Sequence, residues 1–175
     1  MNALDLVDAK VEYQADYRLV SGRWSFGGKV IHAPHRERWE FLNGATPQIL
    51  LLRRDLDEAA MLWPLRRWYM SADFSLLSTL IGGLDREVLH GREAGIEKMG
   101  GETAIRYHVD KGGFIGDFWR SQDGILLKAK GKMTYNGIPT EGELALTNIR
   151  RVKSDPSLFD RPTDYFGIPF KTNNR

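Results

Sequence analysis

Gly-Gly, Asp-Gly and Asn-Gly pairs punctuate the second half of this 175-residue chain at regular intervals. They fall at residues 100–101, 112–113, 123–124 and 136–137, and apolar and polar residues alternate between them. Each interval has room for one long strand, and such pairs are typical of tight hairpin turns. An antiparallel sheet of long strands twists and curls, so we predict a curved sheet whose concave face must be filled.

The same alternation predicts strands in the first half of the chain. Val11, Tyr13 and Tyr17 alternate with polar side chains, as in a strand with one buried face. The predicted strands cover residues 11–19, 23–32, 38–41, 48–53, 58–63, 68–70, 93–99, 102–109, 114–121, 125–135 and 142–152. No linker or repeat interrupts them, so we expect one mainly β domain over residues 1–175.

One segment departs from the apolar–polar alternation of the strands. From Ser71 onwards, apolar residues recur at helical spacing, with Asp73 as a plausible N-cap and Gly82 after the last of them. We predict a helical lid insert over residues 71–90. The last segment, residues 155–175, is rich in proline and aromatic residues, and we expect it to be irregular and docked on the sheet.

Catalytic and metal-binding motifs are poorly represented. The chain has no cysteine, which excludes disulfides and thiolate chemistry. His32 and His35 flank Pro34 at a spacing that could clip a metal, but a third ligand is missing nearby, and we interpret them as surface residues at a strand end. We expect no metal, no cofactor and no enzymatic activity. The net charge of +2 does not favour nucleic acid as a partner.

Basic residues occur in two patterns. Arginine doublets lie at residues 53–54, 66–67 and 150–151, and Lys128 and Lys132 belong to a stripe on one strand face. Contact with anionic headgroups or an acidic partner is one interpretation. For the lysines we favour a solvated sheet face that also discourages edge-to-edge pairing.

Large aromatic and aliphatic residues are more numerous on the strands than one short helix could cover. A curved sheet with such residues inside and an amphipathic helix as a plug is one way to build a cavity for a fatty ligand. Strand phase decides which set faces inward, because a slip of one residue exchanges the two faces. Our candidates for the lining are Trp39, Phe41, Leu50, Leu52, Met61, Trp63, Phe74, Leu77 and Ile81.

Several stretches resemble the LolA-like proteins, the periplasmic carriers of outer-membrane lipoproteins and their relatives. Residues 28–41 resemble the family pattern of a strand, a proline and then a strand bearing aromatic residues. The apolar residues 49–52 and the Leu-Trp-Pro at 62–64 match the next two strands, residues 116–128 a later hairpin, and residues 156–162 the closing segment. Where the carriers often have Asp-Gly, this chain has Arg-Arg-Asp-Leu, so it looks closer to the family's uncharacterised relatives.

The resemblance implies an unclosed antiparallel half-barrel with one or two short helices plugging its concave face. It also implies a hydrophobic cavity for acyl chains, no cofactor, and a place in the periplasm or on the periplasmic side of the outer membrane, with a leader already removed. By position, Arg36 or Arg38 would be the basic residue that holds the lid.

Our leading hypothesis is a non-enzymatic cell-envelope protein that binds the acyl chains of a lipid or lipoprotein, for transport or sorting to the outer membrane. The alternative is an envelope interaction or regulatory module that uses the half-barrel as a scaffold, with an exposed apolar patch around Trp68 and Tyr69. Peripheral contact with a membrane is compatible with both hypotheses.

Overall fold

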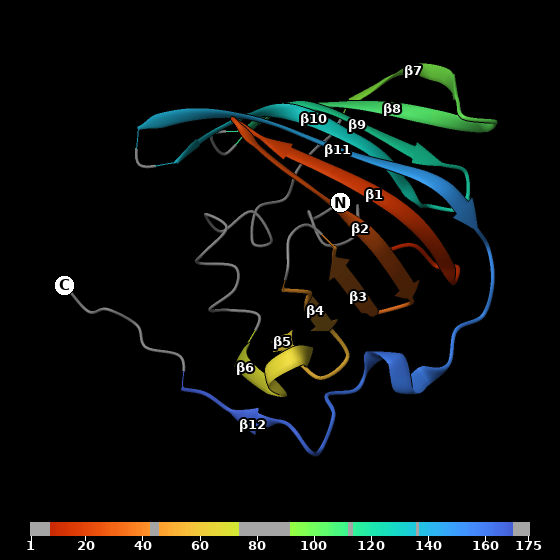
Figure 1. Ribbon diagram of the computed structural model, residues 1–175. Helices are drawn as coiled ribbons and strands as arrows, with labels where there is room; N and C mark the ends of the chain where they lie inside the picture. The colour runs from red at the N-terminus through yellow and green to blue at the C-terminus, as the bar shows by residue number, and fades with distance from the viewer. Residues whose placement is uncertain (1–7, 43–45, 74–91, 112–113, 136, 170–175) are drawn as a thin grey trace.

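The described part of the chain forms one curved sheet of twelve strands (Figure 1). The computed structural model describes residues 8–42, 46–73, 92–111, 114–135 and 137–169. The strands are β1 (Tyr13–Ser21), β2 (Trp24–Ala33), β3 (Arg36–Phe41), β4 (Gln48–Arg53), β5 (Glu58–Trp63), β6 (Trp68–Asp73), β7 (Arg92–Met99), β8 (Glu102–Lys111), β9 (Phe114–Ser121), β10 (Leu126–Tyr135), β11 (Ile138–Arg150) and β12 (Phe166–Gly167).

The strand order is β12-β6-β5-β4-β3-β2-β1-β11-β10-β9-β8-β7. Each of these pairs is antiparallel except β12 with β6, which is parallel. Two hairpin-connected runs, β1 to β6 and β7 to β11, therefore meet where β1 pairs with β11. Because β12 and β7 are free edges, the sheet does not close into a barrel, and the predicted mainly β, unclosed architecture is confirmed.

The glycine turns lie where the sequence predicts them. Gly100 and Gly101 have φ values of +53° and +86° and join β7 to β8, while Gly137, with a φ of +77°, precedes β11. Backbone of this left-handed kind is what a two-residue hairpin needs, and glycine adopts it without steric cost. The turn residues thus fix the register of the long strands.

The two faces of the sheet differ in what covers them. After β11 the chain runs along the outside of the curve and forms the short 3₁₀ helix η2 (Pro156–Phe159) (Figure 1). There Phe159, 1% exposed, packs against Ile31 and Ala33, which places those residues on the convex face. Tyr13, Ala15 and Tyr17 of β1 alternate onto the opposite, concave face, and all three are buried in the main core.

The predicted helical insert is corrected at its start. Ser71 and Asp73 lie in β6, where they pair with Ala60 and Glu58 of β5. The remainder of the insert, with its candidates Phe74, Leu77 and Ile81, lies outside the described residues. The described helices are η2 and a second 3₁₀ turn, η1 (Pro64–Arg66), and none of them is long and apolar enough to cross a membrane.

The C-terminal segment is more ordered than predicted. Besides η2, it contributes β12, in which Phe166 N–H donates to the Arg67 carbonyl at 2.8 Å and Ile168 N–H donates to the Tyr69 carbonyl at 2.8 Å. Asp155 caps η2 by accepting from Ser157 N–H. These backbone bonds, which the proline content does not reveal, hold the segment on the sheet.

Candidate ligand-binding face

Six of the predicted cavity residues share one face of the sheet. Trp39 lies directly opposite Leu50, and Leu50 opposite Met61, across β3, β4 and β5. Phe41, Leu52 and Trp63 follow at even spacing on the same strands, so they point to the same side. This is the concave face, because Trp39 and Phe41 pack against the buried β1 cluster that includes Tyr17.

These side chains are packed side by side but are not sealed from solvent. Tyr17 meets Trp39 edge-on at 5.0 Å between ring centroids and Phe41 at 6.0 Å. Its hydroxyl donates to the backbone carbonyl of Glu40 at 3.2 Å, and burial, with the Glu40 carboxylate, raises the pKa of Tyr17 to about 12. All six predicted residues, including Trp39 and Phe41, are half-buried.

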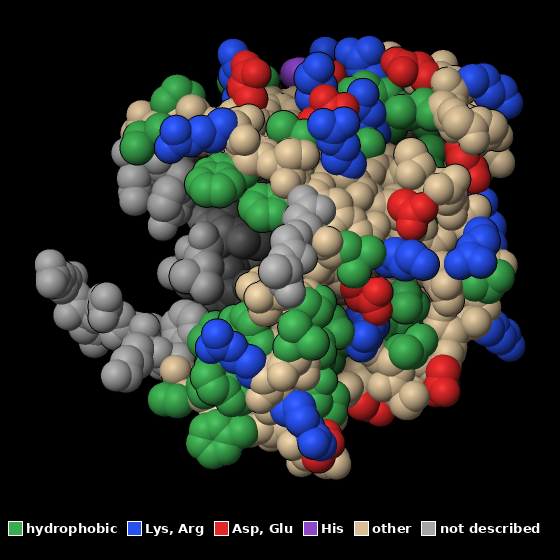
Figure 2. All heavy atoms as spheres, in the orientation of Figure 1, with side chains coloured by type: hydrophobic (Ala, Val, Ile, Leu, Met, Phe, Trp, Pro, Cys, Tyr) green, Lys and Arg blue, Asp and Glu red, His purple; other side chains and the backbone are tan. Residues whose placement is uncertain are grey.

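On the opposite face of the same strands, two leucines are fully buried. Leu51 of β4 is 2% exposed and Leu62 of β5 is 1% exposed, although their concave neighbours Leu50 and Met61 are only half-buried. Figure 2 shows the consequence: a hollow opens on the concave side, with hydrophobic side chains at its margins. The apolar surface that stays accessible is therefore on the inside of the curve.

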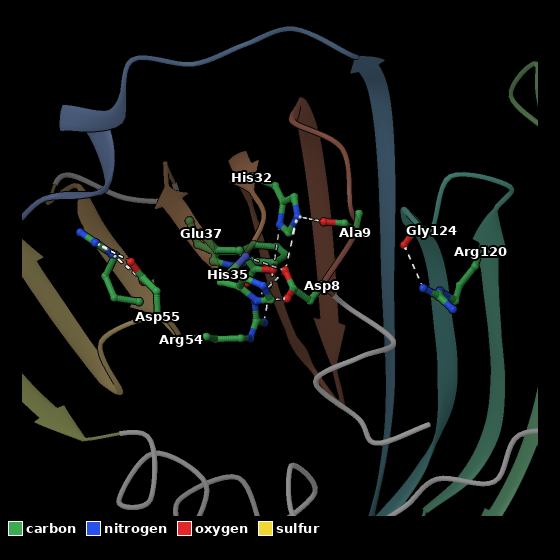
Figure 3. A network of polar contacts seen from close by, with 11 residues as sticks. Asp8, Ala9, His32, His35, Glu37, Arg54, Asp55, Arg120 and Gly124 are labelled. Atoms are coloured by element: carbon green, nitrogen blue, oxygen red, sulfur yellow. Dashed lines mark hydrogen bonds and ion pairs between the residues drawn. The ribbon is translucent and has the colours of Figure 1, made fainter.

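A buried polar cluster, which we call the His32 cluster, lies on the concave side at the hairpin between β2 and β3, next to the turn that follows β4 (Figure 3). It contains Asp8, His32, His35, Glu37 and Arg54. His32 Nδ1 is 3.2 Å from Glu37 Oε1, and His32 Nε2 is 2.8 Å from the Ala9 carbonyl oxygen. Both ring nitrogens face acceptors, so a ring that carries both protons would donate at both contacts.

Three further contacts tie the N-terminal segment and Arg54, which follows β4, into the same cluster. His35 Nδ1 is 2.6 Å from Asp8 Oδ2, and the His35 backbone N–H donates to Asp8 Oδ1 at 2.9 Å. Arg54 Nη2 is 3.4 Å from Glu37 Oε1. Among the described residues, Nε and Nη1 of Arg54 are buried without a hydrogen-bond partner. Hydrogen bonds thus hold the two histidines and the two carboxylates of the cluster together, whereas Arg54 contributes mainly through its charge.

The groups around Glu37 lower the pKa of its carboxyl. Burial alone would raise the pKa of this carboxyl, but the hydrogen bond with His32 and the charge of Arg54 outweigh burial and hold the pKa below its ordinary value. Trp39 Nε1–H also donates to Glu37 Oε2 at 3.1 Å. Through this bond the Glu37 carboxylate positions Trp39. Trp39 is one of the six half-buried concave residues that we call the apolar strip: Trp39, Phe41, Leu50, Leu52, Met61 and Trp63.

The interpretation of His32 as a surface residue is wrong, since its exposed fraction is 0%. His35 is exposed as predicted. The sequence did carry a signal: counted from Val30, His32 falls on the buried face of β2, directly opposite Glu37. In the described part of the chain no group of three potential ligands could hold a metal ion.

The two arginines predicted to hold the lid point away from the hollow. Arg36 and Arg38 alternate with Glu37 and Trp39, so they lie on the convex face. The guanidinium carbon of Arg36 is 5.1 Å from the centre of the Phe159 ring, and Arg38 Nη1–H donates to the Leu158 carbonyl at 3.1 Å. Their described contacts therefore hold η2, and they give no support to a role at the lid.

Comparisons with known proteins define the fold and no more. No family model matches the sequence, and no curated protein matches it. An uncharacterised conserved protein from Thermus thermophilus has a similar structure, with a TM-score of 0.65 and 16% identity over 95% of this chain and 96% of that chain. MucB is similar with a TM-score of 0.60 and 15% identity, over 93% of this chain and 62% of MucB.

MucB is also similar in the Pseudomonas aeruginosa MucA/MucB complex, with a TM-score of 0.58 and 15% identity over 94% of this chain and 60% of that chain. This chain thus spans about three fifths of the length of MucB. The class that these likenesses and the open sheet define is the LolA-like fold. At such low identity the particular relatives show the shared architecture alone.

Proposed function

We propose that this protein is a non-enzymatic, periplasmic protein whose concave face binds the acyl chains of a lipid or lipoprotein. The observation that supports this most is the strip of six half-buried apolar residues on one face, opposite a convex face on which Leu51 and Leu62 are buried. Covering such a surface makes the free energy of binding more favourable by about 25 cal/mol for each Å² of apolar area removed from water. An acyl chain has no polar groups that would need partners in such a site.

The His32 cluster marks one end of the apolar strip. Glu37 lies directly opposite Leu52, so the apolar surface ends on an ion-paired group beside the β2–β3 hairpin. Burial of an acyl methylene contributes about 0.8 kcal/mol, whereas contact with charged groups contributes none of this. We therefore expect the chain to lie along Trp39, Leu50 and Met61 and to stop short of the cluster.

A protein partner is the second candidate, and the similarity to MucB favours it, because MucB has been solved in complex with MucA(peri). On this hypothesis the same open sheet is a scaffold for an envelope protein. The location in the periplasm is part of both proposals, and it is supported by the LolA-like fold alone.

A pair of variants on neighbouring residues separates the two faces. Leu50 and Ile49 are consecutive, half-buried, apolar and on opposite faces of β4. Binding of a dansylated fatty acid, followed by fluorescence, should weaken by about tenfold or more in Leu50→Asn, since most of one leucine contact is lost. Ile49→Asn should bind as the wild type does, and thermal unfolding of both variants checks that they remain folded.

Native mass spectrometry of protein purified from bacteria, before and after incubation with a phospholipid, is the complementary experiment. We expect adducts with the mass of a lipid, and we expect fewer of them with Leu50→Asn. A wild-type protein that neither retains nor acquires lipid, and that binds the dansylated probe no better than Leu50→Asn does, would contradict acyl-chain binding and leave the scaffold as the better hypothesis.

A further inference from the structure

Apolar side chains are exposed at the β12 edge of the sheet, where η1, β6 and β12 meet. Leu65 and Phe166 are each 69% exposed, and Trp68 is 37% exposed. Phe166 pairs with Trp68 in the parallel β12–β6 ladder, so the two aromatic residues are neighbours. We call this surface, with Arg66, Arg67 and Arg161, the β6 lip.

The arginines of the β6 lip lie beside its aromatic rings. The guanidinium carbon of Arg66 is 4.9 Å from the centre of the Trp68 ring. On the opposite face of β6, that of Arg161 is 4.1 Å from the centre of the Tyr69 ring, so the lip has an arginine on each face of this edge strand. Arg67 forms an ion pair with Asp164. Among the described residues no carboxylate pairs with Arg66 or Arg161, so the lip carries an excess of positive charge.

The charge separates this surface from another exposed apolar site. Ile96 of β7 is also 69% exposed, but it follows Glu93 and precedes Glu97, and Glu97 pairs with Arg106 at 3.3 Å. Equal exposure is therefore accompanied by net positive charge at the lip and by no net charge along β7, where Arg92 and Lys98 balance the two glutamates. In Figure 2 hydrophobic and basic side chains gather below the hollow, where Figure 1 places η1, β6 and β12.

We propose that the β6 lip docks on the surface of a bilayer that contains anionic phospholipid. Tryptophan and phenylalanine insert at the boundary between headgroups and acyl chains, and arginine binds phosphate with a planar set of donors. Trp68 also pairs with Trp63, so the lip is continuous with the apolar strip of the concave face. Docked in this way, the hollow lies beside the membrane, and the docking does not itself depend on acyl-chain binding.

Vesicle flotation of the full chain tests this proposal. Vesicles of phosphatidylcholine with phosphatidylglycerol should bind the protein, vesicles of phosphatidylcholine alone should bind it less, and added salt should weaken the binding. Arg66→Gln and Arg161→Gln should each lower the affinity by about fivefold. Leu65→Ser with Phe166→Ser should lower it by about tenfold or more.

Ile96→Ser is the matched control, because it removes an equally exposed apolar side chain from a site with carboxylates; it should leave vesicle binding unchanged. Binding of the dansylated fatty acid should persist in the arginine variants, so that failure of docking is distinguishable from failure of acyl-chain binding. The proposal is overturned if no anionic vesicle binds at low salt, or if Ile96→Ser weakens binding as much as the lip variants do. Binding of poly-glutamate without any binding of vesicles would assign the lip to an acidic protein and would also overturn it.

Discussion

The two halves of the sheet, which we call the first wing (β2 to β6) and the second wing (β8 to β11), differ in the side chains on their convex and concave faces. In the first wing, β2 to β6, the C-terminal segment covers the convex face at Ile31 and Ala33, and the concave face carries large, half-buried apolar residues. In the wing from β8 to β11, the convex face carries ion pairs such as Lys128–Glu143 at 3.2 Å and Lys132–Glu141 at 3.1 Å. The concave face there has glycines in place of large side chains at positions 116, 131 and 142.

The glycines of that wing let an aromatic ring lie against the backbone. A Cβ added at Gly131 would be 2.6 Å from the edge of the Phe114 ring, and one added at Gly116 would be 2.8 Å from it. Phe114 in turn lies 5.2 Å from Phe118 between ring centroids. The concave face of the second wing therefore combines glycines with half-buried rings that lie against them, whereas the first wing presents a row of large apolar side chains across β3, β4 and β5. We expect a bound chain to lie along that row.

The largest expected effect comes from uncovering the convex face of the first wing. Phe159→Ala should lower the free energy of unfolding by about 4 kcal/mol, because a fully buried aromatic side chain is lost and a cavity remains. Urea denaturation measures this. Phe166→Ala, in the same segment but 69% exposed, should cost about 0.5 kcal/mol. Similar losses in the two variants would show that η2 does not seal this face.

The next effect concerns the His32 cluster on the concave side of the same wing. Glu37→Gln should lower the free energy of unfolding by about 3 kcal/mol, because it removes one partner from a buried ion-paired group. Glu40→Gln is the control: Glu40 is on the same strand and pairs with Arg38 at 2.8 Å, but it is partly solvated. We expect that control to lose about 0.5 kcal/mol, and equal losses would argue against a buried charge network.

The same cluster predicts how stability depends on pH. The pKa of Glu37 is lowered in the folded state from an ordinary value of 4.5. Its contribution is therefore complete above the unfolded-state pKa and is lost as pH falls through the folded-state pKa. Between about pH 7 and about pH 3, the free energy of unfolding should fall more steeply in the wild type than in Glu37→Gln. Parallel curves would contradict the assignment.

A smaller effect is expected on the concave face of the second wing. Gly131→Ala should cost about 2 kcal/mol, since its Cβ would lie 2.6 Å from the Ile115 carbonyl oxygen as well as from Phe114. Gly142→Ala should be close to neutral, because its Cβ would meet only the Val20 carbonyl oxygen at 3.5 Å. Thermal unfolding compares the two, and a tolerated Gly131→Ala would mean that this face is not tightly filled.

The smallest effect is expected on the convex face of the second wing. Lys132→Ala removes the ion pair with Glu141, in which the two side chains are 65% and 75% exposed. Such pairs contribute little, so the free energy of unfolding should change by less than about 0.5 kcal/mol. A loss comparable with that of Gly131→Ala would show that the lysine stripe is structural and not simply solvated.

Strand periodicity and turn residues predict most of this fold from the sequence. The glycine turns and the alternation around Tyr13 and Tyr17 are local features of the sequence, so they can be recognised without knowledge of tertiary contacts. The same alternation predicts the shared face of Trp39, Leu50 and Met61. It also separates Arg38 from Trp39, which could have excluded Arg38 from the hollow.

Other features depend on contacts that are distant in sequence. The burial of His32 requires Ala9 and Glu37 as partners, and a histidine beside a proline turn is ordinarily exposed. The path of residues 155–168 depends on Phe159 meeting β2 and on backbone bonds to β6, neither of which a proline-rich composition encodes. The exposure of the β6 lip likewise follows from the edge position of β12.

The central claim, that an acyl chain lies against the concave face of the first wing, is tested most directly by contact quenching. The chain has five tryptophans, so variants that retain one each, with phenylalanine at the others, can report on separate places. Trp39 faces the hollow, while Trp119 lies between Arg106 and Lys128 on the convex face of the second wing. A fatty acid brominated on its chain should quench the fluorescence of Trp39 strongly and that of Trp119 hardly at all. Quenching of Trp119 equal to that of Trp39, or quenching of neither, would contradict the account.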